Sequence, residues 1–223
     1  SIIAATKGFN IVCYDQNEVI INNLSNGILD IKEPNLKENM INYSHNLKFT
    51  NDINYIKDCD IIYLSIDIKT DDQGNSFFEE IENYLRNIDT ILSNKNELVI
   101  LSQVNPGFTR NIKIRVKKIY YQVETLVFGN AVDRASNPER IIIGLKDKNN
   151  ELSNFFKTFL ESFNCPLIKM SYESAELTKI SINLFLIAQV TVTNTISSIC
   201  EKIGADWSEM YPALKLDKTI GEY

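Results

Sequence analysis

Lys179 and Asn183 are the residues whose types and spacing point most directly to chemistry. They are four positions apart in a stretch, residues 174–203, that contains neither Gly nor Pro, so both side chains project from one face of a long helix. An ammonium and an amide directed at one point stabilise an oxyanion as it forms. The alternative is a structural Lys that extends along the helix end and pairs with Glu173 or Glu176. From this pair alone, both interpretations stay open.

Two carboxylates follow strand-like segments. Asp15 comes directly after the apolar run FNIVCY, where a carboxylate in a dinucleotide-binding fold accepts hydrogen bonds from the ribose hydroxyls of the cofactor. Glu124, within YYQVETLVFG, follows a second apolar run, where it is placed to act as a general base through a water molecule. Read singly, each residue has a simpler structural explanation: Asp15 as a turn or helix-cap residue, and Glu124 as a solvated loop glutamate.

Short apolar runs alternate with helical patterns along the chain. Continuous apolar runs of this length are typical of parallel strands covered on both faces, so the pattern predicts a Rossmann-like, doubly wound α/β fold. The expected strands are residues 9–14, 60–66, 98–101, 119–123, 140–143 and 167–170, and the expected helices are residues 18–24, 77–92, 152–163 and 174–203.

The opening residues indicate which part of such a fold is present. Residues 2–7 followed by Gly8 read as the end of a helix that leads into the strand at Phe9. In a dinucleotide-binding fold, that helix follows the first strand and its glycine-rich phosphate loop. No GxGxxG motif occurs in the chain, so we expect a parallel sheet whose first strand and phosphate loop are not part of this sequence. We expect a domain boundary near residue 171, which divides the chain into 1–170, an N-terminally incomplete nucleotide-binding domain, and 171–223, a C-terminally incomplete central helical domain.

Composition excludes several other classes of protein. A net charge of −6 argues against general nucleic-acid binding. The four cysteines are widely separated and the single histidine is His45, so no metal site is expected, and reduced thiols fit a cytoplasmic protein. Polar residues interrupt the apolar stretch 180–192, so we expect a buried core helix there rather than a membrane span.

Several segments, in order and at the right separations, resemble the UDP-glucose/GDP-mannose dehydrogenase family. The resemblance lies in six segments: KGFNIVCYDQNEVIINNLSNG, LDIKEPNL, DCDIIYLSIDIKTDDQGNS, LVILSQVNPGFTR, YYQVETLVFGNAVDRASNPERIIIG and ESAELTKISINLFLIAQVTVTNTISSICEKIGADWSEM. The second is similar to the family's EPGL signature, and the last contains the spacing Lys-x-x-x-Asn. Each motif is weak by itself, and the six together cover essentially the whole chain.

The resemblance implies an NAD-dependent enzyme of polysaccharide biosynthesis. Such an enzyme oxidises the C6 alcohol of a nucleotide sugar to the carboxylate in two steps, with a catalytic cysteine that would lie beyond Tyr223. The implied catalytic residues are Glu124, Lys179 and Asn183, and the implied cofactor-binding residues are Asp15, Ser65 and Gln103. A homodimer formed through the central helix is also implied.

The chain departs from the family pattern at three places. Gln103 replaces a threonine, Asp67-Ile68-Lys69 replaces Pro-Thr-Pro, and Phe128 replaces a second glutamate after Glu124. The sugar and the second oxidation therefore stay open. Two other classes remain at this point. One is a dehydrogenase of the 6-phosphogluconate or β-hydroxyacid type, against which the EPNL segment and the surroundings of Glu124 argue. The other is a non-catalytic homologue or fragment, which the missing phosphate loop favours.

Overall fold

The computed structural model describes residues 1–217 and 219–220. The chain divides into two compact units, residues 1–179 and 180–223, which are described separately. The helices are α1 (Ile2–Thr6), α2 (Glu18–Ser25), α3 (Leu36–Asn42), α4 (Glu79–Asp89), α5 (Phe108–Asn111), α6 (Ala131–Ser136), α7 (Asn154–Glu161), α8 (Tyr172–Ile203) and α9 (Trp207–Leu216), with 3₁₀ turns η1 (Ser44–Asn46) and η2 (Ile53–Asp58). The strands are β1 (Ile11–Tyr14), β2 (Leu47–Thr50), β3 (Ile61–Leu64), β4 (Lys69–Thr70), β5 (Ser76–Phe77), β6 (Glu97–Ile100), β7 (Lys118–Gln122), β8 (Ile141–Leu145) and β9 (Leu167–Ser171).

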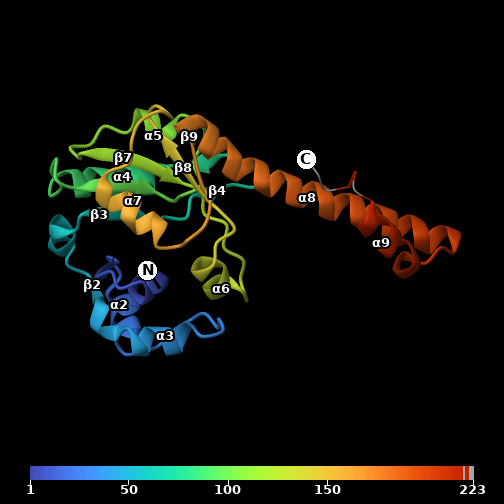
Figure 1. Ribbon diagram of the computed structural model, residues 1–223, viewed down its shortest axis with the longest axis horizontal. Coiled ribbons are helices and arrows are strands. Elements are labelled where there is room, and N and C mark those ends of the chain that lie inside the picture. The colour runs from blue at the N-terminus through green and yellow to red at the C-terminus, as the bar shows by residue number, and fades with distance from the viewer. Residues whose placement is uncertain (218, 221–223) are drawn as a thin grey trace. The chain divides into compact units, whose positions relative to one another are not determined.

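The first unit is built on a largely parallel β-sheet system, as the sequence predicts. Strands β1 and β2 form a parallel pair, and β3, β6, β7, β8 and β9 form a second sheet in that order (Figure 1). Within this second sheet, β3, β6 and β7 run parallel, and β8 and β9 are parallel to each other. The expected α/β architecture is therefore confirmed.

One strand of the larger sheet departs from the parallel expectation. β8 pairs antiparallel with β7, with Tyr121 opposite Gly144. The connection between the two strands contains only the short helix α6. At 18 residues (123–140) this connection is long enough for a parallel crossover, but its one helix is only six residues long and contacts α1. A crossover normally needs a helix packed across the sheet, and without one β8 returns in the opposite direction.

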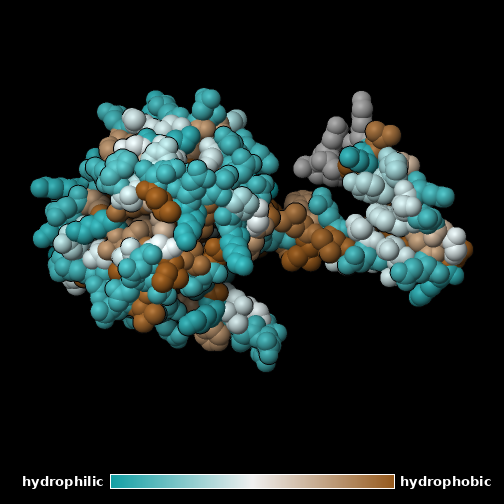
Figure 2. Space-filling view, turned by 90° about the horizontal axis from the view of Figure 1, so that it is seen from below, coloured by the Kyte–Doolittle hydropathy of each residue, from teal (hydrophilic) through white to brown (hydrophobic). Residues whose placement is uncertain are grey.

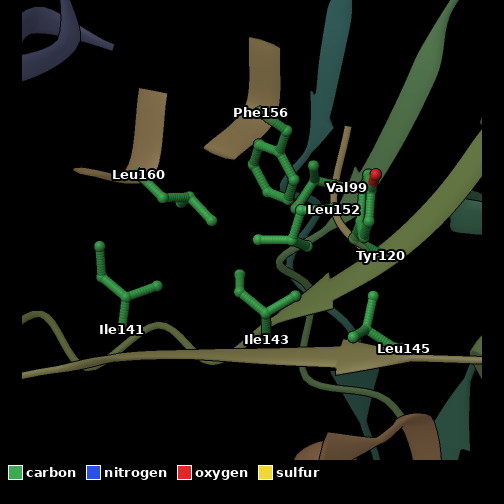
Figure 3. Close-up of a cluster of buried hydrophobic side chains, with 8 residues drawn as sticks. All are labelled: Val99, Tyr120, Ile141, Ile143, Leu145, Leu152, Phe156 and Leu160. Atoms are coloured by element: carbon green, nitrogen blue, oxygen red, sulfur yellow. The ribbon is translucent and has the colours of Figure 1, made fainter. Parts of the chain in front are cut away.

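Helix α7 covers one face of the larger sheet and encloses the main core. Its residues Phe156 and Leu160 are buried, and Figure 3 shows them directed toward the inward-facing side chains of β8. Ser153 caps this helix by accepting a hydrogen bond from the backbone N–H of Phe156. The cluster consists of Val99, Tyr120, Ile141, Ile143, Leu145, Leu152, Phe156 and Leu160.

The start of α8 packs closely on the opposite face of β8. A Cβ atom added at Gly144 would lie 2.9 Å from the Cβ of Ala175 and 3.3 Å from the Cα of Tyr172. Only a residue without a side chain permits this approach. The hydroxyl of Tyr172 donates a hydrogen bond to the backbone oxygen of Ile119 at 2.7 Å, which joins α8 to β7 as well.

The second unit consists of the remainder of α8 and helix α9. Gly204, at φ +77°, ends α8, and its N–H and that of Ala205 both donate to the backbone oxygen of Cys200. Asp206 caps α9 by accepting from the N–H of Ser208 at 2.7 Å. The thiol of Cys200 lies 3.5 Å from the sulfur of Met210, so the two helices pack at this point.

Helix α8 differs from the buried core helix that the sequence suggests. Residues such as Leu184, Phe185, Leu186 and Ile187 are between 55% and 62% exposed, and Figure 2 shows hydrophobic surface along the helix. By length and composition α8 is apolar enough to cross a membrane. A helix that pairs with another protein surface meets the same two criteria. The expectation of burial is wrong for the described residues, because periodicity predicts an apolar helix but not what covers it.

Candidate active site

A crevice of about 1250 Å³ in the first unit is lined by the whole length of β1 and β3, from their amino to their carboxyl ends. Its lining includes Asp15 after β1, Ser65 after β3 and Glu124 after β7, so tertiary structure brings together three of the residues expected from the sequence. Open α/β sheets bind ligands beyond the carboxyl ends of their strands, and these three residues all follow such ends. A smaller cavity of about 320 Å³, near the starts of β6 and β7, contains none of the expected site residues.

Asp15 is positioned by the end of the β1–β2 ladder. Its N–H donates to the backbone oxygen of Thr50 at 3.2 Å, which extends the pairing of the two strands by one residue. One of its carboxylate oxygens accepts from the N–H of Asn17 at 2.7 Å. The side chain is thus held at the turn into α2, where a carboxylate suits the two hydroxyls of a ribose.

Ser65 and Gln103 differ in their relation to the crevice. Ser65 is exposed and lines it directly after β3. Gln103 is exposed on the segment after β6 and does not belong to the crevice lining. Of the two expected cofactor contacts, the crevice therefore includes only Ser65.

Lys179 reaches the segment that contains Glu124, although 55 positions separate the two residues. The Nζ atom of Lys179 donates a hydrogen bond to the backbone oxygen of Glu124. The Glu124 carboxylate accepts from the N–H of Thr125 at 2.9 Å. An ammonium group and a carboxylate are thereby both held after β7. The first is the kind of group that stabilises an oxyanion, and the second is the kind that acts as a general base.

The first turns of α8 are fixed by two acidic residues. The carboxylate of Glu176 is fully buried and accepts from the N–H groups of Gly107 at 2.5 Å and Thr109 at 2.8 Å. Glu173 forms a bidentate pair with Arg110, in which Nη2 of Arg110 lies 2.9 Å from Oε2 of Glu173. Both glutamates therefore bond to the segment after β6, whereas Lys179 bonds to the segment after β7.

The guanidinium of Arg110 also affects ionisation. Its hydrogen bond, together with the backbone N–H of Glu173, lowers the pKa of the Glu173 carboxyl to about 2. The carboxylate is consequently charged at any pH at which the protein is normally handled.

Sequence reasoning did not identify Tyr63 and Gln122, which also line the crevice. The hydroxyl of Tyr63 donates to Oε1 of Gln122 at 3.0 Å. Burial, and then the charge of Glu124, raise the pKa of Tyr63, so the phenol stays protonated and the bond persists. The only signal in the sequence was a tyrosine within an apolar strand, which by itself predicts packing.

Asn183 lies one turn beyond Lys179 on α8, in the second compact unit. Within the described part of the chain, no group of three His, Cys, Asp or Glu side chains is arranged to hold a metal ion. Asp15 and Glu124 line the crevice, and Lys179 bonds to the backbone of Glu124 without belonging to the lining.

The fold and the crevice define the class of protein: a dinucleotide-binding domain of the dehydrogenase type, joined to a long helix that supplies a lysine to the strand ends. Residues 1–163 match the NAD-binding domain of the UDP-glucose/GDP-mannose dehydrogenase family, and residues 173–223 match its central domain. The chain belongs to the UDP-glucose/GDP-mannose dehydrogenase family, and NAD is the cofactor of its first domain.

Individual relatives agree with this assignment. UDP-glucose 6-dehydrogenase TuaD of Bacillus subtilis is 30% identical over 97% of this chain and 49% of its own length. The UDP-glucose 6-dehydrogenase of Rickettsia typhi is 28% identical over 99% of this chain and 53% of its own. The chain spans about half the length of the curated relatives it matches.

Solved structures share the fold. A GDP-mannose dehydrogenase from Pseudomonas aeruginosa superposes with a TM-score of 0.88 at 22% identity, over 97% of this chain and 53% of that one. A UDP-glucose dehydrogenase from Pyrobaculum islandicum gives 0.87 at 23% identity, over 99% and 54%.

Proposed function

We propose that this chain is part of an NAD-dependent nucleotide-sugar 6-dehydrogenase, which oxidises the C6 alcohol of a sugar such as UDP-glucose. The observation that carries the proposal is the hydrogen bond from Lys179 to the backbone oxygen of Glu124, because Glu124 lines the same crevice as Asp15. The names of the relatives support the substrate class. Such an enzyme supplies uronic acid units for polysaccharides.

The residues divide between binding and chemistry. Asp15 accepts hydrogen bonds from the adenosine ribose, and Ser65 and Gln103 contribute further cofactor contacts. NAD, when bound, supplies the hydride acceptor. Lys179 stabilises the negative charge on the C6 oxygen as the hydroxyl proton passes to solvent water, and Asn183 donates a second hydrogen bond to the same oxygen. Glu124 orders and deprotonates the water that the conversion of aldehyde to carboxylate consumes.

The open edges of β1 and β3 support a longer chain. Within the described residues, β1 pairs only with β2 and β3 only with β6, and both strands line the crevice. A parallel strand inserted between them would pair with both edges and would bring a phosphate-binding loop to the crevice. We therefore place the first strand and the glycine loop before Ser1 and expect residues 1–223 alone to be inactive and to bind NAD weakly. The boundary between the cofactor-binding and central domains is placed near residue 171.

The exposed face of α8 supports a homodimer. Apolar side chains from Leu184 to Val192 are unburied, and a second copy of the chain would cover them. A cytoplasmic location is supported by the four cysteines, all of which are free thiols. Neither a nucleic acid nor a membrane has a role in this proposal. Sedimentation of the protein with its flanking sequence tests the dimer, and a monomer at micromolar concentration would contradict it.

The decisive experiment measures NADH formation by the protein with its flanking sequence, supplied with UDP-glucose or GDP-mannose. Lys179→Ala is expected to lower kcat about a hundredfold, which corresponds to roughly 3 kcal/mol of lost transition-state stabilisation. Lys157→Ala is the matched control, because Lys157 is exposed on α7 and pairs with Glu161 on the same helix. Near wild-type turnover in the Lys179 variant would refute its proposed role.

The same assay separates the remaining possibilities. Two NADH per sugar indicate oxidation to the carboxylate, and one NADH indicates that the reaction stops at the aldehyde. Glu124→Gln should abolish the second equivalent and leave the first. No NADH with either sugar would favour a non-catalytic homologue.

A further inference from the structure

The carboxylate of Glu33, in the EPNL segment, bonds to a distant part of the chain. Its Oε1 accepts from the N–H of Gly129 at 2.5 Å and its Oε2 accepts from the N–H of Ala131 at 3.1 Å. These partners are 96 and 98 positions away. Each oxygen thus satisfies one backbone donor at the start of α6, and bonds of this kind to an ionised carboxylate are stronger than neutral ones.

The local sequence presents this carboxylate. Pro34 restricts Glu33 to an extended conformation, and Asn35 adopts the left-handed conformation at φ +61°, which asparagine tolerates better than most residues. The N–H of Leu36 then donates to the backbone oxygen of Glu33 at 3.3 Å and closes the turn before α3. The EPNL motif therefore has a structural explanation: it forms a turn that directs the Glu33 carboxylate toward the start of α6.

The segment between Glu124 and Gly129 has little packing of its own. Leu126 and Val127 are each 50% exposed, and Phe128 is 87% exposed. Its position is consequently set by its ends. Lys179 bonds to the backbone oxygen of Glu124 at the first end, and Glu33 bonds to Gly129 and Ala131 at the second.

We propose that Glu33 is a positioning residue that latches the segment 124–131 at the crevice and thereby orients Glu124. It acts through the backbone and contacts neither substrate nor cofactor. This inference rests on the proposed function for its catalytic consequence, but the latch itself is a property of the protein without ligands. Hydrogen exchange can therefore test it separately from activity.

Glu33→Gln is the most informative change. Glutamine keeps one acceptor oxygen and places an amide NH₂ against the second backbone N–H, so one of the two bonds is lost. Hydrogen exchange of the backbone amides in residues 125–131 should accelerate about tenfold, as expected for the loss of one hydrogen bond to a charged group. Glu33→Asp keeps the charge but is one methylene shorter, so the same acceleration is expected.

The experiment uses the protein with its flanking sequence and hydrogen–deuterium exchange followed by mass spectrometry, without ligands. Glu38→Gln is the matched control, because Glu38 is an exposed glutamate in the first turn of α3. Amides of β6, which is buried along its length, report global unfolding and should be unchanged in all three variants. The latch would be overturned if amides 125–131 exchanged equally fast in wild type and in both Glu33 variants. It would also be overturned if Glu38→Gln accelerated their exchange as much as the Glu33 variants do.

A kinetic measurement then tests its consequence. In the Glu33 variants kcat should fall about tenfold, while the KM for NAD stays unchanged, because Asp15 and Ser65 lie outside the latched segment. Accelerated exchange with unchanged kcat would show that the latch does not orient Glu124. Accelerated exchange in a protein without any dehydrogenase activity would refute the proposed function and leave the latch intact.

Discussion

Glu176 joins the first turns of α8 to the segment after β6, and its replacement tests how Lys179 is positioned. The side chain has no exposed surface, and its two oxygens accept from the N–H groups of Gly107 and Thr109. Both N–H groups lie in the segment after β6, and Glu176 is their partner on α8. Glu176→Gln preserves the volume of the side chain and removes one acceptor.

The size of the effect follows from these contacts. One backbone N–H would face the amide nitrogen of the introduced glutamine and lose its partner, which costs about 1–3 kcal/mol for a buried donor. The other bond would become neutral and weaker, while a buried charge would disappear, and these two changes offset each other in part. We expect the free energy of unfolding to fall by about 2 kcal/mol. With a slope of about 2 kcal/mol per molar urea, the midpoint should drop by roughly 1 M.

The assay is urea unfolding followed by far-UV circular dichroism, on the protein with its flanking sequence. Glu173→Gln is the control: its ion pair with Arg110 involves side chains that are each 39% exposed, so a loss below about 1 kcal/mol is expected. Turnover should also fall in the Glu176 variant, because Lys179 lies one turn further along the same helix. A midpoint within about 0.2 M of wild type would refute the reasoning, since it would mean that the two N–H groups find other partners at no cost.

Two further predictions concern the same contact between α8 and the sheet. Gly144→Ala should lower the free energy of unfolding by about 1–3 kcal/mol, because the new Cβ would lie 2.9 Å from the Cβ of Ala175. In urea unfolding, the double variant Gly144→Ala/Ala175→Gly should recover part of this loss. Additive effects of the two changes would contradict the prediction. The second concerns pH: the folded-state pKa of Glu173 is lowered from 4.5 to about 2, so its contribution to stability is complete above pH 4.5 and disappears as the pH falls toward 2. Urea midpoints between these pH values should fall less steeply in Glu173→Gln than in wild type, and parallel profiles would show that the pair contributes nothing.

The elements that the sequence determined are those with local signals. Apolar runs predicted β1, β3, β6, β7, β8 and β9, and helical periodicity predicted α2, α4, α7 and α8, because strand and helix formation depend on residues a few positions apart. Short or interrupted elements were missed. β2, with the sequence LKFT, has too few apolar residues to stand out, and α9 contains Pro212, which normally ends a helix.

The candidate site shows the same division. Sequence predicted that Asp15 and Glu124 follow strands and that Lys179 lies on a long helix. It did not reveal that Glu33 bonds to Gly129 and Ala131, or that Glu176 bonds to Gly107 and Thr109.

Tertiary structure alone decided those contacts and the reversal of β8. A carboxylate finds a backbone N–H only after several turns, set by residues far apart in the chain, have brought the two together, and no local pattern encodes that meeting. The exposure of α8 has a similar cause. Periodicity makes a helix apolar but does not determine what covers it.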